Sequence, residues 1–415
     1  MAAFVKTESG KRLTDLMTRN YFTNAVKAQE GAFVVWIAIV VPAEILLGFD
    51  KVVYAVPESF AAMTAARGYG PAQSEKAEKM GYSMDLCSYA RIDMGGALDD
   101  QPDSPAGRLP RPHLLVSNNN NCSLLAKWFD VYHREWDIPH FILDVPFCYE
   151  RQSPDDRNYI LLQFRSLIRA IEELSGQRFD LDRVREAVGY SSEAGRHWKQ
   201  FLKCAEHRPS GITAFDSFVQ MAPTLTMRGT PELTEHYRLL ADETEDRVRR
   251  GVYPVPDEHY RLLWDNIAPW HQLRKMQQRL ADAKANIVTA SYTYCLGCLE
   301  GDYAPTFFDP NGDPLEYLAR IQNFSVCPQG MQLRRTAMTE AIRRVQIDGV
   351  VFASNRSCKP YSLMQMDQLR AVSRDTGIPA VMVDVDHADV RSYNESSVFL
   401  RIEALLERID AMRGH

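Results

Sequence analysis

The chain has 415 residues, of which 45% are apolar and 25% charged, a composition typical of a folded globular protein rather than a disordered one. Its 48 basic and 54 acidic side chains give a net charge of −6, so it lacks the basic surplus that would suggest a nucleic-acid partner. The longest apolar run, residues 32–41, reaches about half the length of a membrane-spanning helix, and the N-terminus has no apolar signal core, so we expect a cytoplasmic protein without a membrane contact.

The first part of the chain alternates between short apolar runs and amphipathic stretches. Residues 1–30 are expected to form an N-terminal helical segment. Because strand–helix alternation is typical of a parallel sheet covered on both faces, we assign residues 31–152 to a first α/β domain. Its predicted strands are residues 32–41, 51–57, 113–119 and 140–146.

The middle of the chain differs from both ends. Residues 153–285 contain long helical patterns with no convincing strand, which predicts a helical segment. Residues 286–415 return to alternation and predict a second α/β domain. Its strands are expected at residues 286–292, 348–355 and 378–386. The predicted fold class is therefore α/β, with two flavodoxin-like open parallel sheets joined by a helical segment.

Standard nucleotide-binding motifs are absent from the sequence. No G-x-x-x-x-G-K-[ST] occurs, and no G-x-G-x-x-G follows a predicted strand. The zinc-protease and serine-hydrolase signatures are missing as well. We expect no direct use of ATP or NAD through a standard motif.

Three of the eight cysteines occupy positions where open α/β sheets bind ligands. Cys122 and Cys358 each lie between the carboxyl end of a predicted strand and the next helix. Cys87 lies on a predicted helix of the first half and could face the same cleft. A thiol near a helix N-terminus is more easily ionised and can then bind iron or zinc. On position alone, packing as small buried residues remains the alternative.

The segments around these cysteines resemble a known family. The most specific are DLCSYAR at 85–91 and NRSCKPYS at 355–362. In this order along the chain, they are similar to the catalytic subunits of 2-hydroxyacyl-CoA dehydratases and benzoyl-CoA reductases. The segments that carry the resemblance are residues 41–63, 78–95, 114–131, 141–147 and 354–395.

The resemblance implies a cofactor and partners. Members of this family hold one [4Fe–4S] cluster with three cysteines, and the matching positions are Cys87, Cys122 and Cys358. They work as two related iron–sulfur subunits on an acyl-CoA substrate. A separate ATP-hydrolysing protein supplies low-potential electrons, so ATP would act only through that partner, in agreement with the missing nucleotide motifs.

Two further residues are candidates for proton transfer. Glu58 follows the second predicted strand and matches an acid that lies near the substrate in the family; it could move a proton to or from a thioester. The alternative is a carboxylate that stabilises the start of a helix. His387 follows the last predicted strand and could donate a proton, or it could be a buried structural histidine.

Three other cysteines are candidates for a second metal site. Cys295, Cys298 and Cys327 could bind zinc or enlarge the cluster, as in related double-cubane cluster proteins. Cys148 and Cys204 are expected to be structural.

The reaction is harder to predict than the cofactor. With 12 lysines, the 48 basic residues include 36 arginines, which hints at a GC-rich genome and favours an aromatic degrader. We therefore expect an ATP-dependent, oxygen-sensitive benzoyl-CoA reductase subunit that reduces an aromatic thioester through a ketyl-type radical. The alternatives are a 2-hydroxyacyl-CoA dehydratase subunit, a double-cubane cluster reductase, and a non-catalytic electron-transfer subunit.

Overall fold

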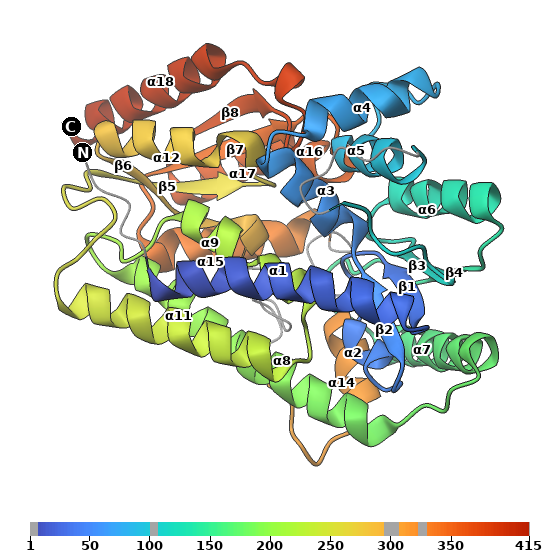
Figure 1. Cartoon of the computed structure of the whole chain (residues 1–415). Coiled ribbons are helices and arrows are strands. Elements are labelled where there is room, and N and C mark those ends of the chain that lie inside the picture. The colour runs from blue at the N-terminus through green and yellow to red at the C-terminus, as the bar shows by residue number, and fades with distance from the viewer. Residues whose placement is uncertain (1–6, 100–106, 294–306, 323–329, 415) are drawn as a thin grey trace.

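Two four-stranded parallel sheets lie side by side in the computed structural model, which describes residues 7–99, 107–293, 307–322 and 330–414 (Figure 1). The strand order is β2-β1-β3-β4 in the first sheet and β6-β5-β7-β8 in the second. The strands are β1 (Phe33–Ile37), β2 (Val52–Ala55), β3 (Leu114–Asn118) and β4 (His140–Leu143), followed by β5 (Tyr260–Asp265), β6 (Ala285–Ala290), β7 (Gly349–Asn355) and β8 (Ala380–Val385).

The two sheets share one topology, and this confirms the predicted α/β fold class. In each sheet the second strand lies outside the first, and the third and fourth follow on the other side. The chain first adds a strand on one side of the sheet and then continues on the other side. The point where the direction changes therefore lies between the neighbouring strands β1 and β3 in the first sheet and between β5 and β7 in the second. Ligands of open parallel sheets bind at such reversal points, beyond the carboxyl ends of the strands.

Helices cover both sheets and fill the space between and below them. In the first half they are α1 (Glu8–Gln29), α2 (Ala43–Leu46), α3 (Pro57–Ala66), α4 (Gly70–Lys79), α5 (Ser88–Ala97) and α6 (Ser123–Trp136). The middle of the chain forms α7 (Pro154–Ser175), α8 (Leu181–Lys203), α9 (Ala214–Gln220), α10 (Ala222–Thr226) and α11 (Pro231–Arg249). The second half contributes α12 (Leu273–Asp282), α14 (Pro314–Ile321), α15 (Met331–Val345), α16 (Lys359–Ser362), α17 (Gln365–Thr376) and α18 (Glu395–Arg413).

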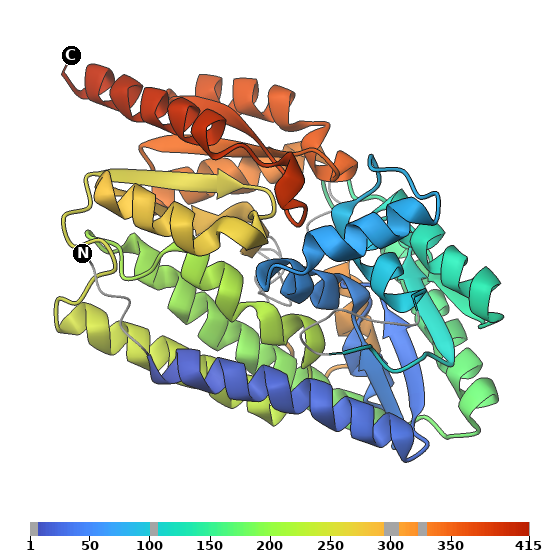
Figure 2. The same ribbon diagram turned by 45° about the horizontal axis from the view of Figure 1, so that its top comes forward.

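A layer of long helices connects the two halves. Helices α8 and α11 pack along each other, and α1 packs on α11, as both views show (Figures 1 and 2). Helix α8 contacts α2 of the first half and α14 of the second. In the part of the chain that is described, every helix is too short or too polar to cross a bilayer.

One stretch of the predicted helical segment is wrong, because β5 lies inside residues 153–285. This strand is central in the second sheet, paired with both β6 and β7, and five of its six residues are buried. A short strand buried on both faces shows no alternation of apolar and polar residues, so its pattern cannot be told from that of a buried helix. The division of the chain into domains stays a prediction.

Candidate functional site

A cleft lies where the carboxyl ends of the two sheets meet. Cys122 follows β3, Cys358 follows β7, and both line the cleft together with Cys87. Its cavity has a volume of about 90 Å³ and is partly open to solvent. Most of the remaining wall is apolar, with contributions from Ile39, Leu124, Leu125, Trp128 and Ile267. The structure therefore brings the three predicted cysteines to one apolar site.

Each of the three cysteines stands immediately before a helix. Cys87 is the N-cap residue of α5, Cys122 of α6 and Cys358 of α16, and none of the three side chains caps its own helix. The prediction that Cys87 lies on a helix is thus wrong by one residue, since α5 begins at Ser88. Burial, together with the nearby Cys122, raises the pKa of Cys87 to about 12. Without a cation the thiol stays protonated, whereas a bound metal would hold it as a thiolate.

Local hydrogen bonds shape the turn before Cys122. The side-chain Oδ1 of Asn118 accepts from the backbone N–H groups of Asn120 at 2.8 Å and Asn121 at 3.1 Å. Asparagine favours this kind of turn, in which a side chain takes the place of a backbone acceptor. The run of four asparagines therefore forms a tight turn that carries the chain from β3 to Cys122.

The donor set is better suited to a metal cluster than to a single ion. Among the described residues, no three histidine, cysteine, aspartate or glutamate side chains converge on one point where an ion would be bound. A cluster of several metal atoms binds each protein ligand at a different metal atom, so its ligands lie farther apart than those of a single ion. Iron–sulfur clusters are bound by cysteine sulfur atoms. Three thiols from three elements around an apolar cleft fit this requirement.

Glu58 faces the same cleft from the first turn of α3. Its Oε1 accepts from the backbone N–H of Ile39 at 2.9 Å, which holds the loop after β1. Its Oε2 is buried and has no hydrogen-bond partner in the described part of the chain. Burial, with a small contribution from the nearby Asp93, raises the pKa of Glu58 to about 7. A carboxyl group with this pKa can both accept and release a proton near neutral pH.

The raised pKa of Glu58 makes stability depend on pH. Since the folded pKa of about 7 lies above the ordinary 4.5, the folded protein binds more protons and loses stability as pH rises through this window. We expect Glu58→Gln, which cannot ionise, to gain about 3 kcal/mol relative to wild type between about pH 5 and about pH 8. Urea unfolding of the metal-free proteins measures this gain; an equal pH dependence in both proteins would contradict it.

His387 also lies at the cleft, two residues after the end of β8. Its Nε2 is 3.0 Å from Ser88 Oγ and 3.6 Å from Cys87 Sγ, and its ring meets the ring of Tyr89 edge-on with centroids 4.3 Å apart. The residue is fully buried, and burial lowers its pKa. Its Nδ1 has no hydrogen-bond partner among the described residues.

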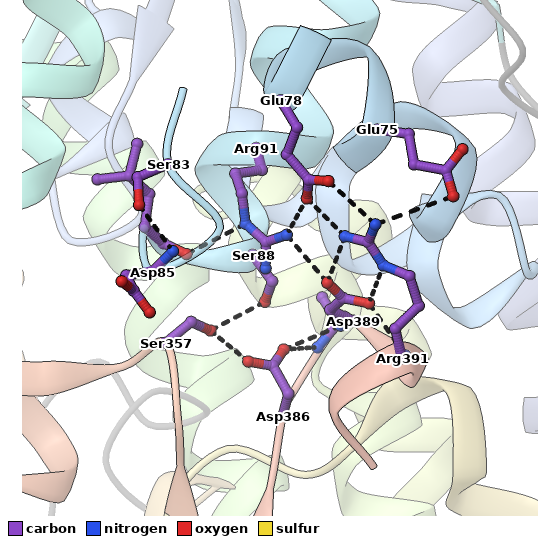
Figure 3. A network of polar contacts seen from close by, with 12 residues as sticks. Glu75, Glu78, Ser83, Asp85, Ser88, Arg91, Ser357, Asp386, Asp389 and Arg391 are labelled. Carbon is purple, nitrogen blue, oxygen red and sulfur yellow. Dashed lines mark hydrogen bonds and ion pairs between the residues drawn. The ribbon is translucent and has the colours of Figure 1, made fainter. Parts of the chain in front are cut away.

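Sequence reasoning missed a partly buried network of charged side chains, which begins at Arg91, four residues after Cys87 (Figure 3). Arg91 of α5 is 2% exposed; its Nη1 lies 2.7 Å from Glu78 Oε1 and 2.9 Å from Asp389 Oδ2. Arg391 pairs with the same two carboxylates at 2.6 and 2.7 Å. We call these four residues the Arg91 network. It ties α4 and α5 of the first half to the loop after β8 in the second.

Two further cysteines lie outside the cleft. Cys148 and Cys204 are buried and do not line it, as expected of structural residues. Cys295, Cys298 and Cys327 lie outside the described residues, so their predicted metal role stays a prediction.

Fold and site together define a class: α/β proteins whose two parallel sheets enclose a cysteine-lined cleft suited to a metal cluster. The chain belongs to the 2-hydroxyglutaryl-CoA dehydratase D-component family, which matches residues 38–409, and this confirms the resemblance. The family comprises catalytic subunits of 2-hydroxyacyl-CoA dehydratases and of benzoyl-CoA reductases.

Three relatives illustrate the range of the family. The chain is 32% identical to the (R)-phenyllactyl-CoA dehydratase alpha subunit of Clostridium sporogenes, over 97% of this chain and 96% of the relative. It is 33% identical to the (R)-2-hydroxyisocaproyl-CoA dehydratase alpha subunit of Clostridioides difficile, with the same coverage. A benzoyl-CoA reductase subunit of Thauera aromatica is 29% identical, over 89% of this chain and 87% of the relative.

Proposed function

We propose that the chain is the alpha-type subunit of a 2-hydroxyacyl-CoA dehydratase, which converts a 2-hydroxyacyl-CoA to a 2-enoyl-CoA and water. The observation that supports this choice is the match to two dehydratase alpha subunits along nearly the whole chain, at 32% and 33% identity. The benzoyl-CoA reductase expected from arginine content becomes the second candidate, supported by the relative at 29%. Arginine content reflects the genome rather than the site, so it is the weaker argument.

In this proposal Cys87, Cys122 and Cys358 hold a [4Fe–4S] cluster in the cleft. Such a cluster, when bound by three protein ligands, supplies an iron with an open coordination position and transfers electrons at low potential. The apolar wall excludes water from the reacting groups, which strengthens the electrostatic interactions inside the cleft. The N-cap positions of the cysteines keep the chain around each sulfur fixed.

Glu58 is the group that we propose for proton transfer. Its Oε1 is engaged by Ile39, while its Oε2 is left without a partner in the described structure and is therefore available to an acyl-CoA thioester. The proposed role of His387 as a proton donor has weaker support, since its Nε2 is directed at Ser88 and Cys87.

We further propose two protein partners. The dehydratase and reductase relatives are each named as one subunit of an enzyme, which implies heteromeric complexes. The second subunit would be a related iron–sulfur protein, and an ATP-hydrolysing protein would deliver the electrons, since the chain has no standard nucleotide motif of its own.

The proposal is tested with the anaerobic complex of this chain, its partner subunit and the electron donor. We expect the complex, supplied with ATP, to convert (R)-2-hydroxyacyl-CoA thioesters to enoyl-CoA and to leave benzoyl-CoA unchanged. Reduction of benzoyl-CoA without dehydration would favour the second candidate. If neither acyl-CoA altered the electron paramagnetic resonance spectrum of this subunit, the chain would instead be a non-catalytic electron carrier.

A further inference from the structure

A chain of hydrogen bonds runs from the second half of the protein to His387 by way of the first half. Asp386 Oδ2 lies 2.6 Å from Ser357 Oγ, which lies 3.2 Å from Ser88 Oγ (Figure 3). Ser88 Oγ in turn lies 3.0 Å from His387 Nε2. All four side chains are buried, with at most 6% exposed. Ser88 directly follows Cys87 and Ser357 directly precedes Cys358, so these hydrogen bonds pass beside two of the proposed cluster ligands.

The direction of these hydrogen bonds follows from the number of available hydrogens. Asp386 Oδ1 accepts from the backbone N–H groups of Ala388 at 3.0 Å and Asp389 at 2.9 Å, an environment that favours a carboxylate. A carboxylate only accepts, so Ser357 must donate its single hydrogen to Oδ2. Ser357 therefore accepts from Ser88, which in turn must accept from His387. The Nε2 atom of His387 thus carries a hydrogen.

The other ring nitrogen agrees with this assignment. His387 Nδ1 is buried and has no hydrogen-bond partner in the described ranges. A buried N–H without an acceptor is rarer and more costly than an unpaired lone pair. His387 is therefore the neutral tautomer with its hydrogen on Nε2.

We propose that Asp386, Ser357 and Ser88 are positioning residues that fix the Nε2–H tautomer of His387, so that this N–H, which donates to Ser88, lies beside the sulfur of Cys87, 3.6 Å from Nε2. The consequence for Cys87 rests on the proposed function, in which Cys87 is a thiolate ligand. An N–H group beside a ligand sulfur stabilises its negative charge and so raises the reduction potential of the cluster.

The test is Asp386→Asn, which should reverse the direction of every hydrogen bond between residue 386 and His387. The two backbone N–H groups hold the amide oxygen at the place of Oδ1, so the amide nitrogen faces Ser357 and can only donate. Each hydroxyl then turns, Ser88 donates to Nε2, and the hydrogen of His387 moves to Nδ1. We expect ¹⁵N-histidine NMR of the full metal-free chain, assigned with His387→Gln, to show Nε2 unprotonated in this variant.

Two further variants make the outcome decisive. Asp384→Asn changes an exposed carboxylate on the same strand β8 and should leave the tautomer as in wild type. Ser357→Ala removes the hydroxyl that links Asp386 to Ser88 and should give a mixture of tautomers. This variant tests the proposal if Asp386→Asn does not fold. A folded Asp386→Asn protein that keeps Nε2–H would overturn it.

A second readout uses the iron-loaded protein. The midpoint potential of Ser357→Ala, which breaks the hydrogen-bond chain without changing any charge, should fall below that of wild type, while that of Asp384→Asn should not change. An equal potential in a Ser357→Ala protein whose tautomer has shifted would refute the link to Cys87. If wild type bound no iron but the tautomer still inverted, the proposed cofactor would be wrong and the positioning role would stand.

Discussion

Replacing Cys122 with serine is expected to remove nearly all iron and acid-labile sulfide from the anaerobically purified protein. Cys122 lines the cleft beside Cys87 and Cys358, and an iron–sulfur cluster with only two protein ligands is not retained. Wild type should contain about four irons and about four sulfides per chain, the content of one such cluster. Chemical iron and sulfide analysis, with the partner subunit present, measures both.

The matched control is Cys204→Ser, because Cys204 is also a buried cysteine but does not line the cleft. This variant should keep its iron. About eight irons in wild type would implicate Cys295, Cys298 and Cys327 in a second cluster or a larger one. Wild-type protein without iron, prepared with oxygen excluded, would contradict the proposed cofactor.

Replacing Arg91 with methionine is expected to lower the free energy of unfolding by about 2–3 kcal/mol. The substitution preserves bulk but removes the charge-assisted hydrogen bonds to Glu78 and to Asp389, a carboxylate only 1% exposed. Arg391 still pairs with both carboxylates, so the loss is that of the hydrogen bonds of Arg91 and not of a carboxylate left without any partner. Urea unfolding at neutral pH measures the loss, and the binding of iron is expected to weaken as well, since the same network holds the loop that carries His387.

The control for this prediction is Arg238→Met. Arg238 also pairs with two carboxylates, Glu235 and Asp242, but on the exposed surface of α11, where 51% of its side chain is accessible. Exposed pairs of this kind contribute about 0–1 kcal/mol because water and salt screen them. A similar small loss in Arg91→Met would show that the Arg91 network does not hold the two halves together.

Much of the fold was predictable from local sequence patterns. Seven of the eight strands in the described part of the chain coincide with apolar runs that the sequence analysis identified, such as β3 within residues 113–119 and β7 within 348–355. These runs can be recognised in the sequence because a strand that is buried on both faces of a parallel sheet is mostly apolar. Cys122 and Cys358 were recognised from these strands in turn, since a residue that follows a strand of a parallel sheet must lie at the carboxyl edge of the sheet. The strand β5 was missed because its flanks carry helical patterns.

The contacts between the two halves were decided by the tertiary structure alone. Ser88 and His387 are separated by 299 residues, and Arg91 and Asp389 by 298. No local pattern distinguishes a buried arginine or serine from an exposed one, because the burial of a polar side chain depends on partners that arrive from elsewhere in the chain. The sequence by itself determined the alternation of strands and helices and the cysteines at strand ends. Only the packing of one sheet against the other decided which polar groups meet beside those cysteines, since their hydrogen bonds form across that interface.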